Sequence, residues 1–103
     1  MQIARSGTIT RFQFGNGWIV SVVPDGGSLV LGGGSDVMVW NTRDVNDTVK
    51  FNYGHGYTES ELLGVTDDKL VAVLHYVTHL PVAEVIARGI PKWIGDQLMQ
   101  LAR

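Results

Sequence analysis

Two histidines four residues apart, His75 and His79, have the spacing of a pair that can do chemistry. On a helix this spacing places both imidazoles on one face, where they could ligate the same zinc or nickel ion. Zinc requires a third and usually a fourth ligand, and the metalloprotease pattern requires a glutamate where this chain has Tyr76. We therefore expect no metal site and assign His75 and His79 to an interface with another protein.

A run of three glycines and two polar residues, at 32–36, is the second candidate. Its backbone N–H groups could form a nest that holds phosphate or another anion, with a tryptophan stacking on a base. The alternative is a turn or bulge that redirects the chain. Known phosphate-binding loops lead directly into a helix, whereas a strand pattern follows here. The residues of this candidate ligand-binding site are Gly32, Gly33, Gly34, Ser35 and Trp40.

Residue patterns typical of enzymes are missing from the sequence. It has no nucleophile-elbow serine, no phosphate-transfer motif and no carboxylate pair on neighbouring strand positions. The absence of cysteine excludes disulfides, thiolate metal sites and cysteine nucleophiles. We predict a protein that is not an enzyme, with no catalytic residues and no cofactor.

The end of the chain has the outline of a helix-turn-helix. Two helical patterns, at 82–88 and 91–101, are separated by Gly89, and Pro91 begins the second. The segment resembles helix-turn-helix sequences at Ala83, Glu84, Gly89, Ile90 and Leu98. It departs from them at Arg88, which is normally small and buried, and at Gly95, which is normally aliphatic. The resemblance implies a second helix in the DNA major groove that presents Lys92, Trp93, Asp96, Gln97 and Gln100.

The overall charge argues against nucleic acid as the main partner. A formal net charge of −2 removes the general attraction on which most binders of DNA or anionic membranes depend. The sequence has neither a secretion signal nor an apolar run long enough to cross a bilayer. We expect a cytoplasmic protein that binds no membrane, with DNA binding through 82–101 as one alternative function.

Two turn dipeptides organise residues 8–31. Asn16-Gly17 and Asp25-Gly26 are typical of two-residue type I′ loops, so they predict three antiparallel strands. The first loop would set Phe14 opposite Ile19, Phe12 opposite Ser21 and Arg11 opposite Val22. The second would set Val22 opposite Leu29, Val20 opposite Leu31 and Trp18 opposite Gly33.

This register makes both faces of the meander apolar. One face would carry Phe12, Phe14, Ile19, Val23 and Val30, and the other Trp18, Val20, Val22, Leu29 and Leu31. An antiparallel sheet with one solvated face alternates apolar and polar residues instead. We therefore expect the helices to cover one face, and further strands or a second copy of the chain to cover the other.

The remaining elements follow from periodicity. Alternating residues predict strands at 37–42 and 49–53, joined by a loop or hairpin end at 43–48. Thr58 and Glu61 form a capping box that predicts a short helical turn at 59–63. A longer helix runs from its cap Thr66 to about His79. Its predicted apolar stripe on the sheet is Leu70, Val73, Leu74 and Val77.

The sequence thus predicts one α+β domain over 1–103, strand-rich at 1–54 and helical at 58–103. A mainly antiparallel five-stranded sheet, a meander plus a hairpin, precedes about three helices packed on it. The expected function is that of a small regulatory or adaptor protein that binds another protein and self-associates. Large apolar residues of the last helix, Trp93 and Met99, are the predicted interface with His75 and His79. Small proteins of this kind are common in phages and mobile elements, an analogy of size alone.

Overall fold

A computed structural model describes residues 1–24, 34–42, 44–81 and 92–103, with side chains left undescribed at 44–47 and 92. The described chain is an α+β structure in which an antiparallel sheet is followed by helices. Its strands are β1 Gln2–Ser6, β2 Ile9–Gln13, β3 Trp18–Pro24, β4 Ser35–Asn41, β5 Asp44–Thr48, β6 Phe51–Gly54, β7 Tyr57–Glu59 and β8 Leu62–Val65. Its helices are α1 Asp67–Thr78 and α2 Lys92–Ala102.

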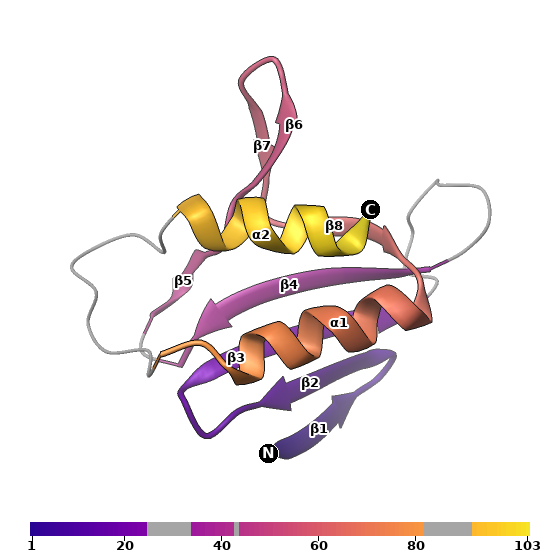
Figure 1. Cartoon of the computed structure of the whole chain (residues 1–103). Coiled ribbons are helices and arrows are strands. Elements are labelled where there is room, and N and C mark those ends of the chain that lie inside the picture. Colours follow the sequence, from indigo (N-terminus) through magenta and orange to yellow (C-terminus); the bar gives the residue numbers. More distant parts are fainter. Residues whose placement is uncertain (25–33, 43, 82–91) are drawn as a thin grey trace.

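The main sheet has the strand order β1-β2-β3-β4-β5, and β8 also pairs with β4. Figure 1 shows both helices on the same side of this sheet. The described part of the chain has two helices rather than the predicted three or so. The helix expected at 82–88 lies outside the described residues. Neither described helix is long and apolar enough to cross a membrane.

The hairpin at Asn16-Gly17 is confirmed, but its predicted register is wrong by one residue. Gln13 pairs with Ile19 and Phe12 pairs with Val20. The N–H of Gly17 donates to the carbonyl of Phe14 at 3.1 Å, and Gly17 has a φ of 87°. This is a three-residue loop, a turn followed by a left-handed glycine, rather than a two-residue type I′ loop. The extra residue moves every side chain of β2 to the opposite face.

The second hairpin of the predicted meander is also wrong. The Asp25-Gly26 dipeptide lies outside the described residues, but the strand that pairs with β3 is β4. Val22 lies opposite Val37, and Trp18 lies opposite Asn41. β4 therefore occupies the side of β3 that was predicted for residues 29–33.

These two corrections change the faces of the sheet. The face toward the helices is the core, which contains Phe12, Phe14, Trp18, Val20, Val22, Val37 and Val39. The opposite face mixes apolar, polar and charged side chains, namely Ile9, Arg11, Ile19, Ser21, Val23, Asp36, Met38 and Trp40. The prediction of two apolar faces is therefore wrong, since Phe12 and Phe14 both join the core.

The strand predicted at 49–53 exists, but not in the main sheet. Val49 and Phe51 are buried as expected, while β6 pairs with β7 in a separate hairpin. Figure 1 shows this hairpin projecting away from the rest of the molecule. Residues 44–48, predicted as a loop or hairpin end, form β5 beside the end of β4.

The short helical turn predicted at 59–63 is wrong. This segment contains the end of β7 and the start of β8, and β8 places Leu62 opposite Val37. Leu62 and Val65 are both buried. Pairing with β4 and burial of these two side chains override the local capping-box signal, which is a weak preference by comparison.

The main helix, α1, forms as predicted. Thr66 is its N-cap and His79 its C-cap, and Asp67 and Asp68 lie in its first turn. Val73 and Val77 are fully buried, and Leu70 and Leu74 pack against the core as the apolar stripe requires.

The last helix, α2, lies close against the chain just before β6. Its buried residues are Ile94, Gly95, Leu98 and Met99. A Cβ atom added to Gly95 would lie 2.1 Å from the carbonyl oxygen of Lys50. The glycine that departs from the helix-turn-helix pattern is therefore needed for helix-to-strand contact.

Candidate binding surface

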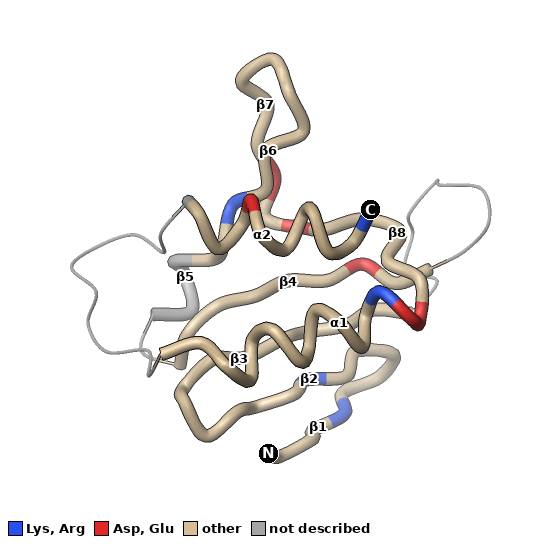
Figure 2. The backbone as a smooth tube through the Cα atoms, in the orientation of Figure 1, with Lys and Arg blue, Asp and Glu red and all other residues tan. Residues whose placement is uncertain are grey.

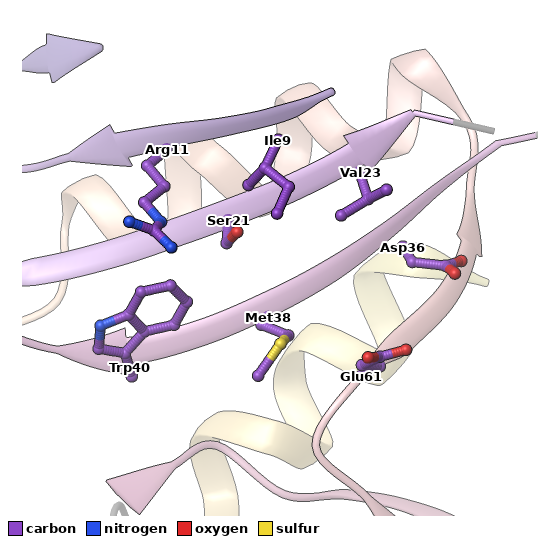
Figure 3. A pocket seen from close by; sticks show the side chains of 8 residues that line it. All are labelled: Ile9, Arg11, Ser21, Val23, Asp36, Met38, Trp40 and Glu61. Carbon is purple, nitrogen blue, oxygen red and sulfur yellow. The ribbon is translucent and has the colours of Figure 1, made fainter. Parts of the chain in front are cut away.

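A hollow of about 550 Å³ lies on the sheet face opposite the helices. Figure 3 shows its side chains on β2, β3, β4 and the segment just before β8, with the helices behind the sheet. They are Ile9, Arg11, Ser21, Val23, Asp36, Met38, Trp40 and Glu61. We call this the first hollow.

The strand register arranges one row of these residues across the sheet. Arg11 lies opposite Ser21, and Ser21 lies opposite Met38. On its other side β4 pairs with β8, where Leu62 lies opposite Val37. Glu61, the residue just before β8, therefore lies next to Met38. From β2 to β8 the row therefore consists of a cationic, a small polar, a large apolar and an anionic side chain.

The two ends of the first hollow carry opposite charge. Figure 3 shows Arg11 and Trp40 at one end and Asp36 and Glu61 at the other. The guanidinium carbon of Arg11 lies 5.9 Å from the ring centre of Trp40, within the range of a cation–π contact. Asp36 is buried and accepts a hydrogen bond from the Gly64 N–H at 3.3 Å. The backbone view in Figure 2 shows a basic residue on β2 and acidic residues on β4 and before β8.

A second hollow, of about 360 Å³, adjoins the first and shares Glu61 with it. Its other lining residues are Tyr53, Tyr57, Glu59 and Leu63, most of them from the projecting hairpin. The side chain of Tyr57 is 58% exposed and that of Leu63 is 42% exposed. Together the two hollows form a continuous surface, which we call the binding surface.

Hydrogen bonds fix the two tyrosines of the second hollow. The Tyr53 hydroxyl donates to the Glu61 carbonyl at 2.8 Å and accepts from the Leu63 N–H at 3.1 Å. Burial raises the pKa of Tyr53. The Tyr57 hydroxyl donates to the Glu59 carboxylate, and this hydrogen bond raises the pKa of Tyr57. Both phenols are therefore neutral donors at physiological pH.

The predicted glycine-loop site lies partly outside the described residues. Gly32 and Gly33 lie outside the described residues, and Ser35 is a buried residue of β4. A Cβ atom on Gly34 would lie 2.7 Å from the Gly64 carbonyl carbon, so Gly34 serves a close backbone contact. Trp40 lies six strand positions from Gly34, roughly 20 Å along β4. Trp40 nevertheless lines the first hollow, together with Asp36.

The two histidines lie side by side on α1. Their ring centres are 4.4 Å apart, and Nδ1 of His79 is 2.9 Å from the His75 carbonyl oxygen. Both are exposed. Within the described ranges, no group of three His, Cys, Asp or Glu side chains is placed to hold a metal ion.

The two predicted interface residues of α2 have different environments. Trp93 is 52% exposed, whereas Met99 is only 7% exposed and belongs to the core. The prediction that Met99 meets a partner is therefore corrected, because it faces inward with Leu98. Asp96, Gln97 and Gln100 are exposed on α2, as the helix-turn-helix resemblance implies.

Most residues of the binding surface were not predicted from the sequence, among them Arg11, Met38, Tyr57, Glu61 and Leu63. A register one residue different would have placed Arg11 beside Ser21 and away from the core. The residues near 57–63 were not recognised because the capping box predicted a helical turn in a segment that forms β7 and β8.

Comparison of the chain with known protein families, with curated proteins and with solved structures finds no match.

Proposed function

We propose that this chain is a non-catalytic regulatory or adaptor protein that acts by docking another protein on its binding surface. The observation that supports this function is the adjacency of two hollows that share Glu61. Their union extends from the sheet face onto the projecting β6–β7 hairpin, which gives a longer contact than either hollow alone.

The residue types of the binding surface favour a protein partner. Trp, Tyr, Met and Arg are enriched in the cores of protein interfaces, and Trp, Tyr and Arg dominate binding hot spots. Trp40, Tyr53, Tyr57, Met38 and Arg11 supply these types here. The half-exposed Tyr57 and Leu63 offer apolar area whose removal from water would favour association.

Site-specific photocrosslinking in the cells that make the protein tests this proposal. A benzophenone amino acid replaces Met38 in the first hollow, or Tyr57 in the second. The matched control places it at Val71, which is 66% exposed and belongs to α1, the helix on the opposite side of the sheet from the first hollow. Protein adducts from positions 38 or 57 but not 71 would support docking on the binding surface. Adducts from position 71 alone, or none, would overturn it.

Binding of a small molecule in the first hollow is a second candidate. A volume of about 550 Å³ lies within the range of small-ligand sites, which is roughly 300–1,000 Å³. The Arg11–Trp40 end suits an anionic or planar group. Thermal unfolding with inorganic phosphate and with nucleotides tests this alternative, since a rise in Tm that is lost in Arg11→Ala would support it. No rise with either probe would reject it for these ligands.

A further inference from the structure

We infer that the first hollow is occupied by a second copy of this chain, with the sheet faces opposite the helices packed on one another around a two-fold axis. This inference rests on the proposed function, because it names the partner that docks on the binding surface. The supporting observation is the row of Arg11, Ser21, Met38 and Glu61 across the sheet. When a second copy of this row is laid over it in the opposite order, Arg11 faces Glu61 and Ser21 faces Met38.

The symmetry operation follows from the strand order. A two-fold axis parallel to the strands, midway between the two sheets and between β3 and β4, exchanges β3 of one copy with β4 of the other. In an isologous pair of this kind each contact occurs twice. Facing sheets pack about 10 Å apart, so side chains of the two faces interdigitate.

The centre of the row matches in size. The operation sets the long Met38 side chain over the small Ser21 of the second copy, and the reverse contact forms as well. On the next row it sets Ile19 near Trp40 of the second copy, since these two residues lie opposite one another on β3 and β4. Both are already buried in the single chain, at 7% and 9% exposed, so this second contact adds little area. Large side chains meet small ones at the first position, and apolar side chains meet at the second.

The ends of the row match in charge. Arg11 lies on β2, beyond β3, and Glu61 lies beyond β4, so the operation brings each Arg11 to the Glu61 of the other copy. Both residues are exposed in the single chain. Asp36 adds a second carboxylate at the same end of the hollow. An arginine between two carboxylates forms charge-assisted hydrogen bonds that fix orientation as well as adding attraction.

Reciprocal charge reversal tests this arrangement. Sedimentation equilibrium of the unmodified chain should give a mass that rises with concentration from 11.3 kDa toward twice that value. Arg11→Glu alone and Glu61→Arg alone should each weaken dimerisation about tenfold or more, since each homodimer then contains two like-charge contacts. An equimolar mixture of the two variants should restore association, because a mixed dimer regains two opposite-charge pairs.

Two control variants carry the same charge changes at other places. Arg5→Glu changes β1 on the helix side of the sheet, because Arg5 lies opposite Thr10 and beside the Ile3–Phe12 pair. Asp96→Arg changes the exposed face of α2. Both controls should dimerise as the unmodified chain does. Circular dichroism of every variant checks that the fold is retained.

Several results would overturn the inference: a chain that stays monomeric to about millimolar concentration, a dimer that ignores both reversals, or a mixture that fails to associate. A monomeric chain that still crosslinks to a different protein through position 38 would reject the second copy and leave the proposed function standing. Absence of both dimer and crosslink would reject the two together.

Discussion

At the scale of single residues, two glycines lie so close to neighbouring backbone that a side chain would not fit. Gly95 on α2 lies against the carbonyl of Lys50, and Gly34 lies against the backbone of Gly64 with a φ of 111°. From the sequence, the glycines at 32–34 could form either an anion nest or a turn, and Gly95 departs from the helix-turn-helix pattern. A single sequence does not show which backbone a glycine will meet, because that depends on tertiary contacts.

Replacing Gly95 with alanine should destabilise the protein. In an isolated helix this change would add about 1 kcal/mol of stability. Here the new methyl group would lie 2.1 Å from backbone, so α2 must move, and we expect a net loss of about 1–3 kcal/mol. Urea unfolding measures the change. Gly15→Ala, which meets nothing within 4 Å, is the control. A Gly95→Ala variant more stable than the unmodified chain would contradict the packing of α2.

The effect of crowding at Gly34 can be separated from that of its φ angle. Gly34 and Gly54 both have positive φ, at 111° and 99°, but a Cβ on Gly54 meets nothing within 4 Å. Gly34→Ala should therefore lose more stability than Gly54→Ala, with the excess reporting the contact with Gly64. Thermal and urea unfolding of the two variants give the comparison. Equal losses would mean that β4 and β8 are not in close contact here.

At the scale of elements, Asn16 joins a turn to the end of a helix. Its amide nitrogen donates to the carbonyls of Val77 and Leu80, at 2.8 and 3.0 Å. Its side-chain oxygen accepts from the Trp18 N–H at 3.2 Å, and the Trp18 indole donates to the Pro81 carbonyl at 3.0 Å. The dipeptide that predicted a turn thus also fixes the C-terminal end of α1 to the sheet.

Substitutions at Asn16 should show this connection. Asn16→Ala should cost about 1–3 kcal/mol of stability, because helix-end carbonyls lose their donor. Asn16→Asp should cost more at pH 7, since its carboxylate would face those carbonyls and its folded-state pKa would be raised. A raised folded-state pKa means that the stability contributed by the new carboxyl group is fully present below about pH 4, and that this contribution is lost as the pH rises.

Urea unfolding at pH 4 and pH 7 measures this difference. The gap between Asn16→Asp and Asn16→Ala should narrow at the lower pH, where the new carboxyl is protonated and can donate. Asn52→Ala is the matched control, because the hydrogen bond that Asn52 accepts from the Gly54 N–H lies within its own hairpin. If Asn16→Ala costs no more than this control, the connection to α1 contributes nothing.

In the β6–β7 hairpin, the hydrogen bond from the Tyr57 hydroxyl to the Glu59 carboxylate can be tested through the pKa of Tyr57. The Glu59 carboxylate raises the pKa of Tyr57, so Glu59→Gln should lower that pKa toward the usual value of about 10. Titration of Tyr57 by NMR measures the change. Glu61→Gln should leave the Tyr57 pKa in place, because Glu61 makes no contact with this phenol that raises it. If Glu59→Gln leaves the Tyr57 pKa unchanged, the hydrogen bond between Tyr57 and Glu59 would be contradicted.

Elements with strong periodicity could be predicted, and those decided by pairing could not. The helix at α1, with its Thr66 cap and its buried Val73 and Val77, follows from a repeat of 3.6 residues over three turns. The strand at β4 follows from clean alternation at Val37 to Trp40. The loop before β3 depends on whether two or three residues form the turn, and both suit Asn-Gly. That one-residue difference determines on which face of the sheet Arg11 lies, so the first hollow could not be predicted from the sequence.

At the scale of the whole molecule, stability should be concentrated in the middle of the sheet. β3 and β4 are paired on both sides and carry the fully buried Val20, Val37 and Val39. Among the described strands, β1 pairs with β2 alone and all five of its residues are exposed, while β6 and β7 pair with one another alone. Strands with few buried contacts open locally, whereas those in the core open only with the global transition.

Hydrogen exchange of the dilute, monomeric chain tests this distribution. Amides of β3 and β4 should exchange at least about a hundredfold more slowly than those of β1 and of the β6–β7 hairpin. At concentrations where two copies associate, opening of the peripheral β2 and of the segment at Glu61 should slow, since both lie at the ends of the self-complementary row. Slowing confined to β1 would instead indicate pairing through the free strand edge, a different dimer from the one inferred here. Uniform protection of all strands in the dilute chain would show that the sheet opens as one unit.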